Sequence, residues 1–318
     1  MQYRRIGKSG IRVSSVSIGG WLTFGGSIDD AATSGILSAA RDAGVNFVDL
    51  ADVYARGAAE EAAGRALADV PRHELVLSSK VFWPMSDDPN DRGLSRKHVI
   101  ESCERSLRRL GTDYLDLYFC HREDPETPLE ETARAMDDLV RQGKILYWGT
   151  SVWSAASLQR AHDVADHRGL DAPIVEQPRY SLLHREIEGA VQPKAAELGM
   201  GLVVWSPLAG GLLTGKYDDG VPEGSRGSVS EWLSNDLNDD NLQRLRRFSE
   251  LARETGCSPS QLALAWALER PAIASVITGA TRADQLRENL GALDVQLDEA
   301  LRSELDSLFP GPGATSDA

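Results

Sequence analysis

The chain reads YLDLYFCHREDPETPLEETARAMDDLVRQGKILYWGT over residues 114–150, and this stretch decides the fold class. An apolar run at Tyr114–Cys120 precedes a helical pattern, which is followed by a second apolar run at Ile145–Thr150. Both runs have the length of a strand and few charges, which is typical of strands buried on both faces of a parallel sheet. The stretch therefore predicts a strand–helix–strand unit of an α/β protein.

The helix between the two runs carries signals at both of its ends. Residues 127–130 read TPLE, which predicts a capping box with Thr127 at the N-cap and proline at the first helical position. Apolar residues then recur at helical spacing until Gly143 stops the helix. Ser95 and Ser258 predict two further helix starts of the same kind.

The same alternation repeats along the whole chain. Six more apolar runs of strand length are separated by helical patterns, namely Val16–Gly19, Asn46–Leu50, Glu74–Ser79, Ile174–Gln177, Gly201–Trp205 and Ser275–Gly279. Strands that alternate with helices in this way fit either a closed (β/α)8 barrel or an open doubly wound sheet. No break in composition divides the chain, which favours a single-domain (β/α)8 TIM barrel over residues 1–310.

Two segments fall outside the alternation. The segment Lys216–Asp240 is rich in Gly, Ser, Asp and Asn, which predicts a long loop of the kind that usually carries function. Residues 311–318 predict a disordered C-terminal tail.

Composition excludes several classes of partner. The formal net charge is −14 with no basic block, so we expect no nucleic-acid partner and no binding to an anionic membrane. No apolar stretch is long enough to span a bilayer, and the N-terminus does not resemble a signal peptide. The three cysteines fit neither a disulfide framework nor a metal site, and no histidine pair has zinc-site spacing. We therefore expect a cytoplasmic protein without a metal ion and without membrane insertion.

Two glycine-rich stretches fall short of nucleotide-binding motifs. Residues 19–26 read GGWLTFGG, which is not the GxGxxG fingerprint of an open dinucleotide-binding sheet. Residues 210–217 read GGLLTGKY, in which Tyr217 stands where a P-loop needs the Ser or Thr that holds Mg²⁺. A glycine-rich turn with a lysine can still approach a phosphate group, although a plain turn with a surface lysine explains the same residues.

Four polar residues stand at or just beyond the ends of successive predicted strands. Asp49 closes one strand and Tyr54 lies in the loop beyond it, while Lys80 and His121 follow the next two strands. The carboxyl ends of barrel strands meet at the face that holds the active site, so we expect these side chains to lie together. Taken singly, each also fits an ordinary structural role, such as a helix cap or a surface lysine.

These residue types suit proton transfer to a carbonyl oxygen. The hydroxyl of Tyr54 has an ordinary pKa of about 10, and we expect the ammonium of Lys80 to lower it. Asp49 would hold that ammonium in place, and His121 would hydrogen-bond a substrate carbonyl. The set moves protons but supplies no electrons, so it requires a hydride donor such as a nicotinamide cofactor.

With these residues in place, the chain resembles the aldo-keto reductase family over about residues 1–310. Within that family it is most similar to the branch that contains the voltage-gated potassium-channel β subunits and their bacterial relatives. The resemblance rests on five segments in order, GLSRKH at 93–98, LGTDYLD at 110–116, YWGTS at 147–151, WSPLAGG at 205–211 and GKY at 215–217.

The resemblance implies a (β/α)8 barrel that binds NADP(H) across its C-terminal face and reduces a small-molecule carbonyl substrate to an alcohol. The substrate would be an aldehyde, a ketone or a small sugar. The residues that match the catalytic tetrad are Asp49, Tyr54, Lys80 and His121, with Tyr54 as the proton donor. The residues expected to wall the substrate pocket are Trp21, Tyr54, Trp83 and His121.

The resemblance also implies a set of cofactor contacts. They are Trp21, Asp49, Ser151, Gln177, Trp205, Ser206, Pro207, Leu208, Gly210, Lys216, Arg226, Gly279, Thr281, Arg282, Gln285, Glu288 and Asn289. Within this set, Ser151 and Gln177 match residues that hold the nicotinamide carboxamide, and Tyr180 matches a position that supports its ring. Lys216 and Arg226 match residues on the phosphate side of the closing loop.

The end of the chain supplies the expected adenosine side of the cofactor. Thr281 would cap a helix, and a helix N-terminus binds anions well. Arg282 would contact the 2′-phosphate, which favours NADPH over NADH.

Three features separate this chain from the channel β subunits. Those subunits carry a basic residue where this chain has Val152, so an identical cofactor affinity does not follow. They also carry asparagine where this chain has His121, and this chain begins at the barrel without a long N-terminal extension. We therefore expect an active reductase and no channel association. The alternatives are a redox-sensing regulatory subunit with little turnover and a non-redox barrel that retains a cofactor. The branch tends toward tetramers, so a homo-oligomer is expected by analogy alone.

Overall fold

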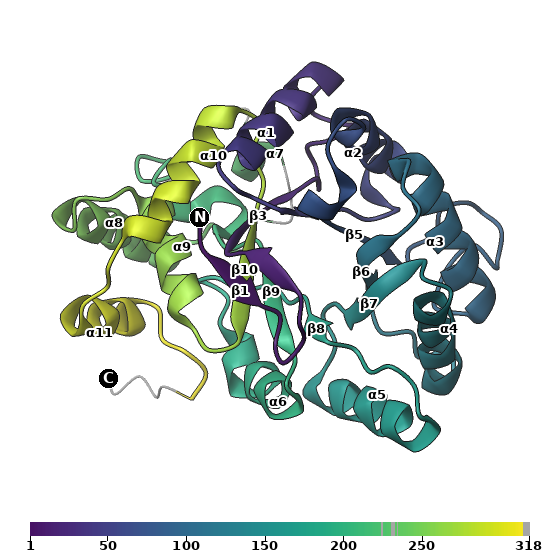
Figure 1. Ribbon diagram of the computed structural model, residues 1–318. Coiled ribbons are helices and arrows are strands. Elements are labelled where there is room, and N and C mark those ends of the chain that lie inside the picture. Colours follow the sequence, from purple (N-terminus) through teal and green to yellow (C-terminus); the bar gives the residue numbers. More distant parts are fainter. Residues whose placement is uncertain (224, 230–232, 234, 314–318) are drawn as a thin grey trace.

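A closed ring of parallel strands forms the centre of the computed structural model, which describes residues 1–223, 225–229, 233 and 235–313 (Figure 1). In this part of the chain the ring has the strand order β10-β3-β4-β5-β6-β7-β8-β9. Its strands are β3 (Val16–Gly19), β4 (Phe47–Asp49), β5 (Val76–Val81), β6 (Leu115–Cys120), β7 (Ile145–Thr150), β8 (Val175–Glu176), β9 (Gly201–Trp205) and β10 (Ile273–Thr278). The structure is a single-domain (β/α)8 TIM barrel, as the sequence predicted, and Val276 pairs with Val16 where the ring closes.

Helices surround the ring on its outside, as Figure 1 shows. They are α1 (Asp30–Asp42), α2 (Ala58–Leu67), α3 (Arg96–Leu110), α4 (Leu129–Arg141), α5 (Ala155–Arg168), α6 (Val191–Leu198), α7 (Arg226–Val229), α8 (Asp239–Glu254), α9 (Pro259–Glu269), α10 (Ala283–Leu290) and α11 (Glu299–Leu308). Short 3-10 turns lie between them at η1 (Tyr54–Gly57), η2 (Arg72–Glu74), η3 (Glu186–Gly189), η4 (Ala209–Thr214) and η6 (Gly291–Asp294).

Side chains along each barrel strand alternate between the inside of the ring and the surrounding helices. In β5, Val76 belongs to the apolar cluster inside the ring, whereas Leu77 packs in the cluster beneath the helices. The same period of two directs Lys80 inward, near the C-terminal end of the strand. Phe47 lies inside the ring in β4, so Asp49, two residues later, also faces inward. Apolar layers thus fill the lower part of the barrel and polar side chains its upper end.

An antiparallel hairpin of β1 (Tyr3–Arg5) and β2 (Arg12–Ser14) covers the opposite end of the barrel, in front of the ring in Figure 1. Ile6 and Val13 are fully buried and join the apolar cluster inside the ring. The sequence analysis missed this hairpin, because its strands are three residues long and carry several charges. The hairpin leaves the C-terminal end of the strands as the end at which polar side chains meet solvent.

Of the helix caps predicted at Ser95, Thr127 and Ser258, those at Ser95 and Ser258 are confirmed. The Ser95 hydroxyl oxygen accepts from a backbone amide at the start of α3, and Ser258 forms a full capping box at α9. The capping box at Thr127 is wrong. Helix α4 has Pro128 at its N-cap, and the Thr127 hydroxyl instead donates to Asp124 at 2.8 Å. A carboxylate three residues upstream binds this hydroxyl before the helix can use it.

Several boundaries differ from the prediction, and two of these differences lie near the C-terminal end of the barrel strands or in the predicted long loop. Strand β5 extends to Val81, so Lys80 lies within the strand rather than after it. The predicted loop Lys216–Asp240 contains the short helix α7, and α8 already begins at Asp239. Within the predicted tail, residues 314–318 lie outside the described residues.

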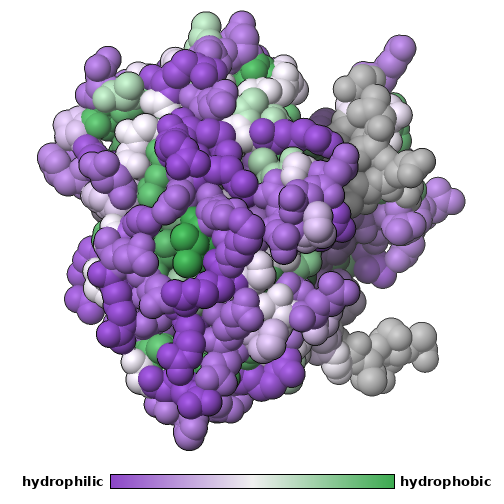
Figure 2. All heavy atoms as spheres, turned by 90° about the vertical axis from the view of Figure 1, so that its right-hand side faces the viewer, coloured by the Kyte–Doolittle hydropathy of each residue, from purple (hydrophilic) through white to green (hydrophobic). Residues whose placement is uncertain are grey.

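The outer helices present a largely hydrophilic surface. Figure 2 shows the face on the right-hand side of Figure 1, where hydrophobic residues form small separate patches among hydrophilic ones. This face includes α3 and α4, whose buried residues recur at helical spacing and whose remaining positions are mostly polar. None of the helices described is both long and apolar enough to cross a membrane.

Candidate active site

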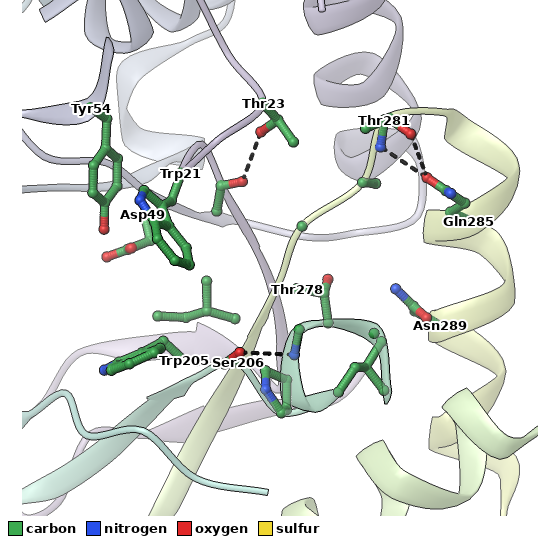
Figure 3. Close-up of a pocket in the computed structure, with 18 of the residues that line it drawn as sticks. Trp21, Thr23, Asp49, Tyr54, Trp205, Ser206, Thr278, Thr281, Gln285 and Asn289 are labelled. Carbon is green, nitrogen blue, oxygen red and sulfur yellow. Dashed lines mark hydrogen bonds between the residues drawn. The ribbon is translucent and has the colours of Figure 1, made fainter. Parts of the chain in front are cut away.

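A cavity of about 900 Å³ opens at the C-terminal ends of the strands. Figure 3 shows Tyr54, Trp21 and Trp205 towards one end of the cavity. Thr281 and Gln285, at the start of α10, lie towards the other end. The structure brings every predicted site residue to the lining of this cavity except Lys80, Tyr180 and Arg226. Lys80 lies beneath the lining, and Arg226 opens α7 with its side chain outside the described part of the chain.

The tetrad end of the cavity is organised around a fully buried ammonium. Lys80 Nζ donates to Asp49 Oδ2 at 2.7 Å, to the carbonyl oxygen of Leu50 at 2.6 Å and to the hydroxyl of Tyr54 at 3.2 Å. A charged amine without water needs this many acceptors, because burying an unpaired charge is costly. The contacts place the ammonium within hydrogen-bond distance of the tyrosine hydroxyl.

Two further side chains fix the carboxylate of Asp49. Its Oδ1 accepts from the Ser78 hydroxyl at 2.8 Å and from the Gln177 side-chain amide at 2.9 Å. Ser78 lies two residues before Lys80 on β5 and faces inward for the same reason. The carboxylate is therefore held from three sides, and the lysine is held through it.

Tyr54 reaches the site from a strained turn. It begins η1 directly after β4, and the next two residues, Ala55 and Arg56, have φ values of 48° and 53°. Side chains other than glycine rarely adopt positive φ, and such strain is usually retained at functional sites. The turn brings the Tyr54 phenol over the C-terminal end of the barrel. There the aromatic rings of Tyr54 and His121 lie 6.0 Å apart, centre to centre, in an edge-on arrangement.

The pKa of Tyr54 moves in the direction opposite to the expectation. Burial, followed by the negative charge of Asp49, raises the pKa of this phenol well above its ordinary value. Lys80 does not offset these effects, because its closest charged contact is Asp49, and burial lowers the pKa of Lys80 itself. The phenol is therefore protonated at neutral pH, which is the form that a proton donor requires.

His121 is also held uncharged. Burial and the positive charges of Lys80 and Arg122 lower the pKa of this imidazole well below its ordinary value. Its backbone amide donates to the Val81 carbonyl at 2.9 Å, which fixes the residue at the end of β6. A neutral imidazole has one N–H to donate, so it can polarise a carbonyl oxygen without adding charge to the site.

The ends of β7, β8 and β9 contribute polar and aromatic side chains to the cavity. The Ser151 hydroxyl donates to the carbonyl oxygen of Gln177 at 2.8 Å, which links the ends of β7 and β8. Trp205, at the end of β9, lies 6.4 Å from Trp21 between ring centres. Tyr180 is fully buried outside the cavity lining, where it stacks on Trp266, so its expected support of the nicotinamide ring stays a prediction.

The glycine-rich turn of residues 210–217 curls around a lysine. A side chain at Gly211, which has a φ of 104°, would place its Cβ 2.7 Å from the ammonium of Lys216. The missing side chain thus makes room for the lysine against the backbone. Tyr217 is buried, and its hydroxyl accepts from the backbone amide of Gly227 at 3.0 Å. Tyr217, which departs from the P-loop pattern, therefore holds the start of α7 through a hydrogen bond.

The start of α10 carries the positive charge of Arg282. The Arg282 guanidinium is exposed and pairs with Asp284 at 3.1 Å. Thr281 does not cap the helix as expected, since Arg282 occupies the N-cap position. Instead, Gln285 Oε1 accepts from the backbone amide and hydroxyl of Thr281 and from the amide of Arg282 (Figure 3).

The sequence analysis missed several residues of the lining. These are Gly19, Thr23, Val53, Arg122, Gly211, Thr214, Ser225, Ser260, Ile277, Thr278 and Ala280. Many of them adjoin a residue that was identified, such as Arg122 after His121. Their proximity in sequence was the available signal, since each strand end contributes neighbouring residues to the same face.

The structure is thus a (β/α)8 barrel in which a buried lysine–carboxylate pair lies beside a tyrosine hydroxyl at one end of a cavity. The family model described as the Aldo/keto reductase family matches residues 15–309, and the chain belongs to this family. Its members generally use NADP(H).

Curated relatives match over nearly the whole chain. A protein of Oryza sativa subsp. japonica, named a probable voltage-gated potassium channel subunit beta, is 48% identical over 93% of this chain and 92% of its own length. A protein of Arabidopsis thaliana with the same name is 46% identical over the same shares. A putative subunit of this kind from Schizosaccharomyces pombe is 42% identical over 92% of this chain and 88% of its own length.

Proposed function

We propose that this protein is an NADPH-dependent reductase of aldehydes, ketones or small sugars, with Tyr54 as the proton donor. The observation that carries the proposal is the buried ammonium of Lys80, which touches both Asp49 and the Tyr54 hydroxyl. A surface lysine or a helix cap would not be built in this way. The three free cysteines fit a reducing cytoplasm as the place of action.

The donor set of the cavity suits NADP(H). The Ser151 hydroxyl and the Gln177 amide offer hydrogen bonds near the tetrad, and the indole of Trp205 offers a flat surface beside them. Lys216 and Arg282 provide positive charge further along the cavity, where a pyrophosphate and a 2′-phosphate need it. The volume of about 900 Å³ is large enough for most of a dinucleotide.

The side chains of the tetrad then complete the reduction. A bound NADPH supplies the hydride that adds to the carbonyl carbon. The neutral imidazole of His121 donates a hydrogen bond to the carbonyl oxygen and orients it. The Tyr54 hydroxyl gives its proton to that oxygen, so the product is an alcohol and the tyrosine becomes a phenolate. Lys80, 3.2 Å away, stabilises the phenolate until solvent returns the proton.

A second function is favoured by the curated relatives. They are named as potassium channel β subunits, which supports a redox-sensing regulatory subunit with little turnover. His121 favours the reductase, since the channel β subunits that this chain resembles carry asparagine at the matching position. By analogy with the same branch we expect a homotetramer, which native mass spectrometry of the purified protein tests.

Nicotinamide absorbance, followed across a panel of aldehydes and ketones, separates the two functions. We expect carbonyl-dependent oxidation of NADPH, and slower oxidation of NADH. Tight binding of NADPH without turnover of any carbonyl in the panel would refute the reductase and favour the regulatory subunit.

A further inference from the structure

Arg122 is a cation at the wrong end of the cavity for a cofactor phosphate. Within the described lining, the permanently positive side chains belong to Arg122, Lys216 and Arg282. Lys216 and Arg282 lie on the turn after β9 and at the start of α10, where the proposed phosphates fall. Arg122 instead follows His121 directly, so its charge stands beside the tetrad.

The side chain of Arg122 is held against the wall of the proposed substrate pocket. Its Nη1 donates to the carbonyl oxygen of His121 at 2.5 Å, and its guanidinium carbon lies 5.5 Å from the ring centre of Trp83. The Trp83 ring lies 6.2 Å from that of His121. The guanidinium is thus fixed one side chain away from the point where a carbonyl oxygen would bind, and its Nε and Nη2 make no hydrogen bond to a described residue.

No acidic side chain among the described residues neutralises this charge. A carboxylate within 4.0 Å would form an ion pair, and Arg122 has none in the described part of the chain, although it is half-buried. Glu176 is the carboxyl group whose charge Arg122 feels, but its oxygens accept from the Thr150 hydroxyl and the backbone amide of Trp153. Burial also raises the pKa of Glu176 to about 7, which leaves it partly neutral.

A half-buried cation without a counter-ion destabilises a fold, so a ligand that supplies the negative charge explains its presence. A guanidinium binds carboxylate or phosphate in a fixed two-pronged geometry. The protein as a whole carries a net charge of −14 and repels anions, so an anionic substrate needs a local cation of this kind.

We propose that Arg122 selects carbonyl substrates that carry an anionic group, a carboxylate or a phosphate, a few bonds from the reacting carbon. This inference rests on the proposed reductase function. Arg122 would bind the anion, while Trp21 and Trp83 would pack against the carbon skeleton between the anion and the carbonyl.

The test compares matched aromatic aldehydes. The substrates are 4-carboxybenzaldehyde, 4-formylphenyl phosphate and the neutral methyl 4-formylbenzoate, each with NADPH. We expect the anionic substrates to have the higher kcat/KM, and Arg122→Gln to lower the ratio of acid to ester by about tenfold or more, mainly through KM. Arg122→Lys should restore part of the ratio. A larger effect on the phosphate or on the carboxylate identifies which anion the pocket fits.

A matched cation in the same cavity provides the control. Lys216→Gln should raise the KM for NADPH and leave the acid-to-ester ratio as it is in the original chain. An equal loss with all three aldehydes in Arg122→Gln, or a preference for the ester in the original chain, would overturn the inference.

Binding of a product analogue separates this inference from the proposed function. Calorimetric titration of the NADPH complex with 4-(hydroxymethyl)benzoate needs no turnover. Binding that is lost in Arg122→Gln supports the anion site even if no aldehyde is reduced. Absence of binding to the original chain, or equal binding to Arg122→Gln, refutes it whatever the activity.

Discussion

The side-chain amide of Gln177 donates to Asp49 Oδ1 at 2.9 Å across the mouth of the barrel. The two residues are 128 positions apart, and their strands, β8 and β4, stand on opposite sides of the ring. The bond joins the proposed nicotinamide position directly to the carboxylate that holds Lys80. A change at Gln177 is therefore expected to reach Tyr54, the proposed proton donor, through Asp49 and Lys80.

Replacement of Gln177 by leucine tests this link. We expect Gln177→Leu to lower the free energy of unfolding by about 1–3 kcal/mol, because Asp49 loses a buried hydrogen bond to a charged group. The KM for NADPH should rise as well. Urea denaturation measures the first effect and steady-state kinetics the second. Gln2→Leu is the control, since Gln2 is exposed and the change should cost about 0.5 kcal/mol or less. Equal stability of both variants would contradict the link.

Removal of the Tyr54 hydroxyl tests proton transfer. We expect Tyr54→Phe to lower kcat for carbonyl reduction by about 100-fold or more, while the Kd for NADPH stays close to that of the original chain. Tyr147→Phe, a part-buried tyrosine on β7, is the matched control. Retention of the original kcat in Tyr54→Phe would remove the proton-donor role.

The raised pKa of Tyr54 also predicts a pH profile. The donor is the protonated phenol, and a pKa well above the ordinary value keeps it protonated through the neutral and mildly alkaline range. Reductive kcat/KM should therefore show no alkaline fall between about pH 7 and pH 9. A clear fall in that window, absent from Tyr54→Phe, would mean that Lys80 lowers the pKa in the complex after all.

Replacement of Arg282 and replacement of Asp284, which form an ion pair, should change NADPH binding in opposite directions. Arg282→Ala should lower the ratio of kcat/KM for NADPH over NADH by about 10-fold to 100-fold, because a charged contact to the 2′-phosphate is lost. Asp284→Asn should raise NADPH affinity, since it releases Arg282 from its ion pair at 3.1 Å. Fluorescence titration at low salt measures both affinities. A fall in NADPH affinity in Asp284→Asn would show that the ion pair positions the arginine for binding.

Asp52 predicts a pH-dependent change in stability. Burial raises its pKa to about 7, and one of its carboxylate oxygens has no hydrogen-bond partner among the described residues. The folded state binds the proton more tightly than the unfolded chain, so stability from this group is present at acid pH and is lost as pH rises through 7. Asp52→Asn should escape this loss, which is on the order of 4 kcal/mol.

Thermal unfolding at several pH values measures the effect. The Tm difference between Asp52→Asn and the original chain should move in favour of the variant from about pH 5 to about pH 8. Asp69→Asn, at an exposed position, should show no such trend. A difference that does not change with pH would mean that Asp52 keeps its ordinary pKa.

Gly149 sets the distance between two strands beside the cavity. A Cβ at this residue would lie 2.4 Å from Val175 Cγ1 and 2.7 Å from the Val175 carbonyl oxygen, across the pair β7–β8. We expect Gly149→Ala to lower the free energy of unfolding by about 2–4 kcal/mol. Gly10→Ala, where a Cβ meets nothing within 4 Å, is the control in the same denaturation series. Equal stability of the two variants would show that the strands separate at little cost.

Local pattern was enough to predict the barrel and the tetrad residues near its strand ends, whereas most other residues of the cavity lining were predicted from the family resemblance. Apolar runs mark strands that are buried on both faces, and the end of each run identifies the residues that face the cavity. Thr127 shows the limit, because a cap depends on which partner the hydroxyl meets in the fold, and here that partner is the carboxylate of Asp124. The β1–β2 hairpin escaped for a related reason, since its burial comes from two residues, Ile6 and Val13, against a distant ring.

Properties that depend on three-dimensional surroundings could not be predicted. The pKa of Tyr54 depends on burial and on whether Asp49 or the phenol lies closer to Lys80, and sequence spacing does not give those distances. The position of Arg122 in the cavity is of the same kind. An arginine after a strand is usually solvated, and only the packing of Trp83 and His121 around it shows otherwise.

The closure of the ring between β10 and β3 also sets an order of events during synthesis. Strand β3 pairs with β4 on one side and with β10 on the other, the latter through Val16 and Val276, so the barrel cannot close before β10 has been made. Lys80, Asp49 and Tyr54 leave the ribosome early, whereas α10 leaves more than 150 residues later. A growing chain thus carries the residues of the proposed tetrad long before it has the proposed nucleotide site, which is complete only after α10 has been made.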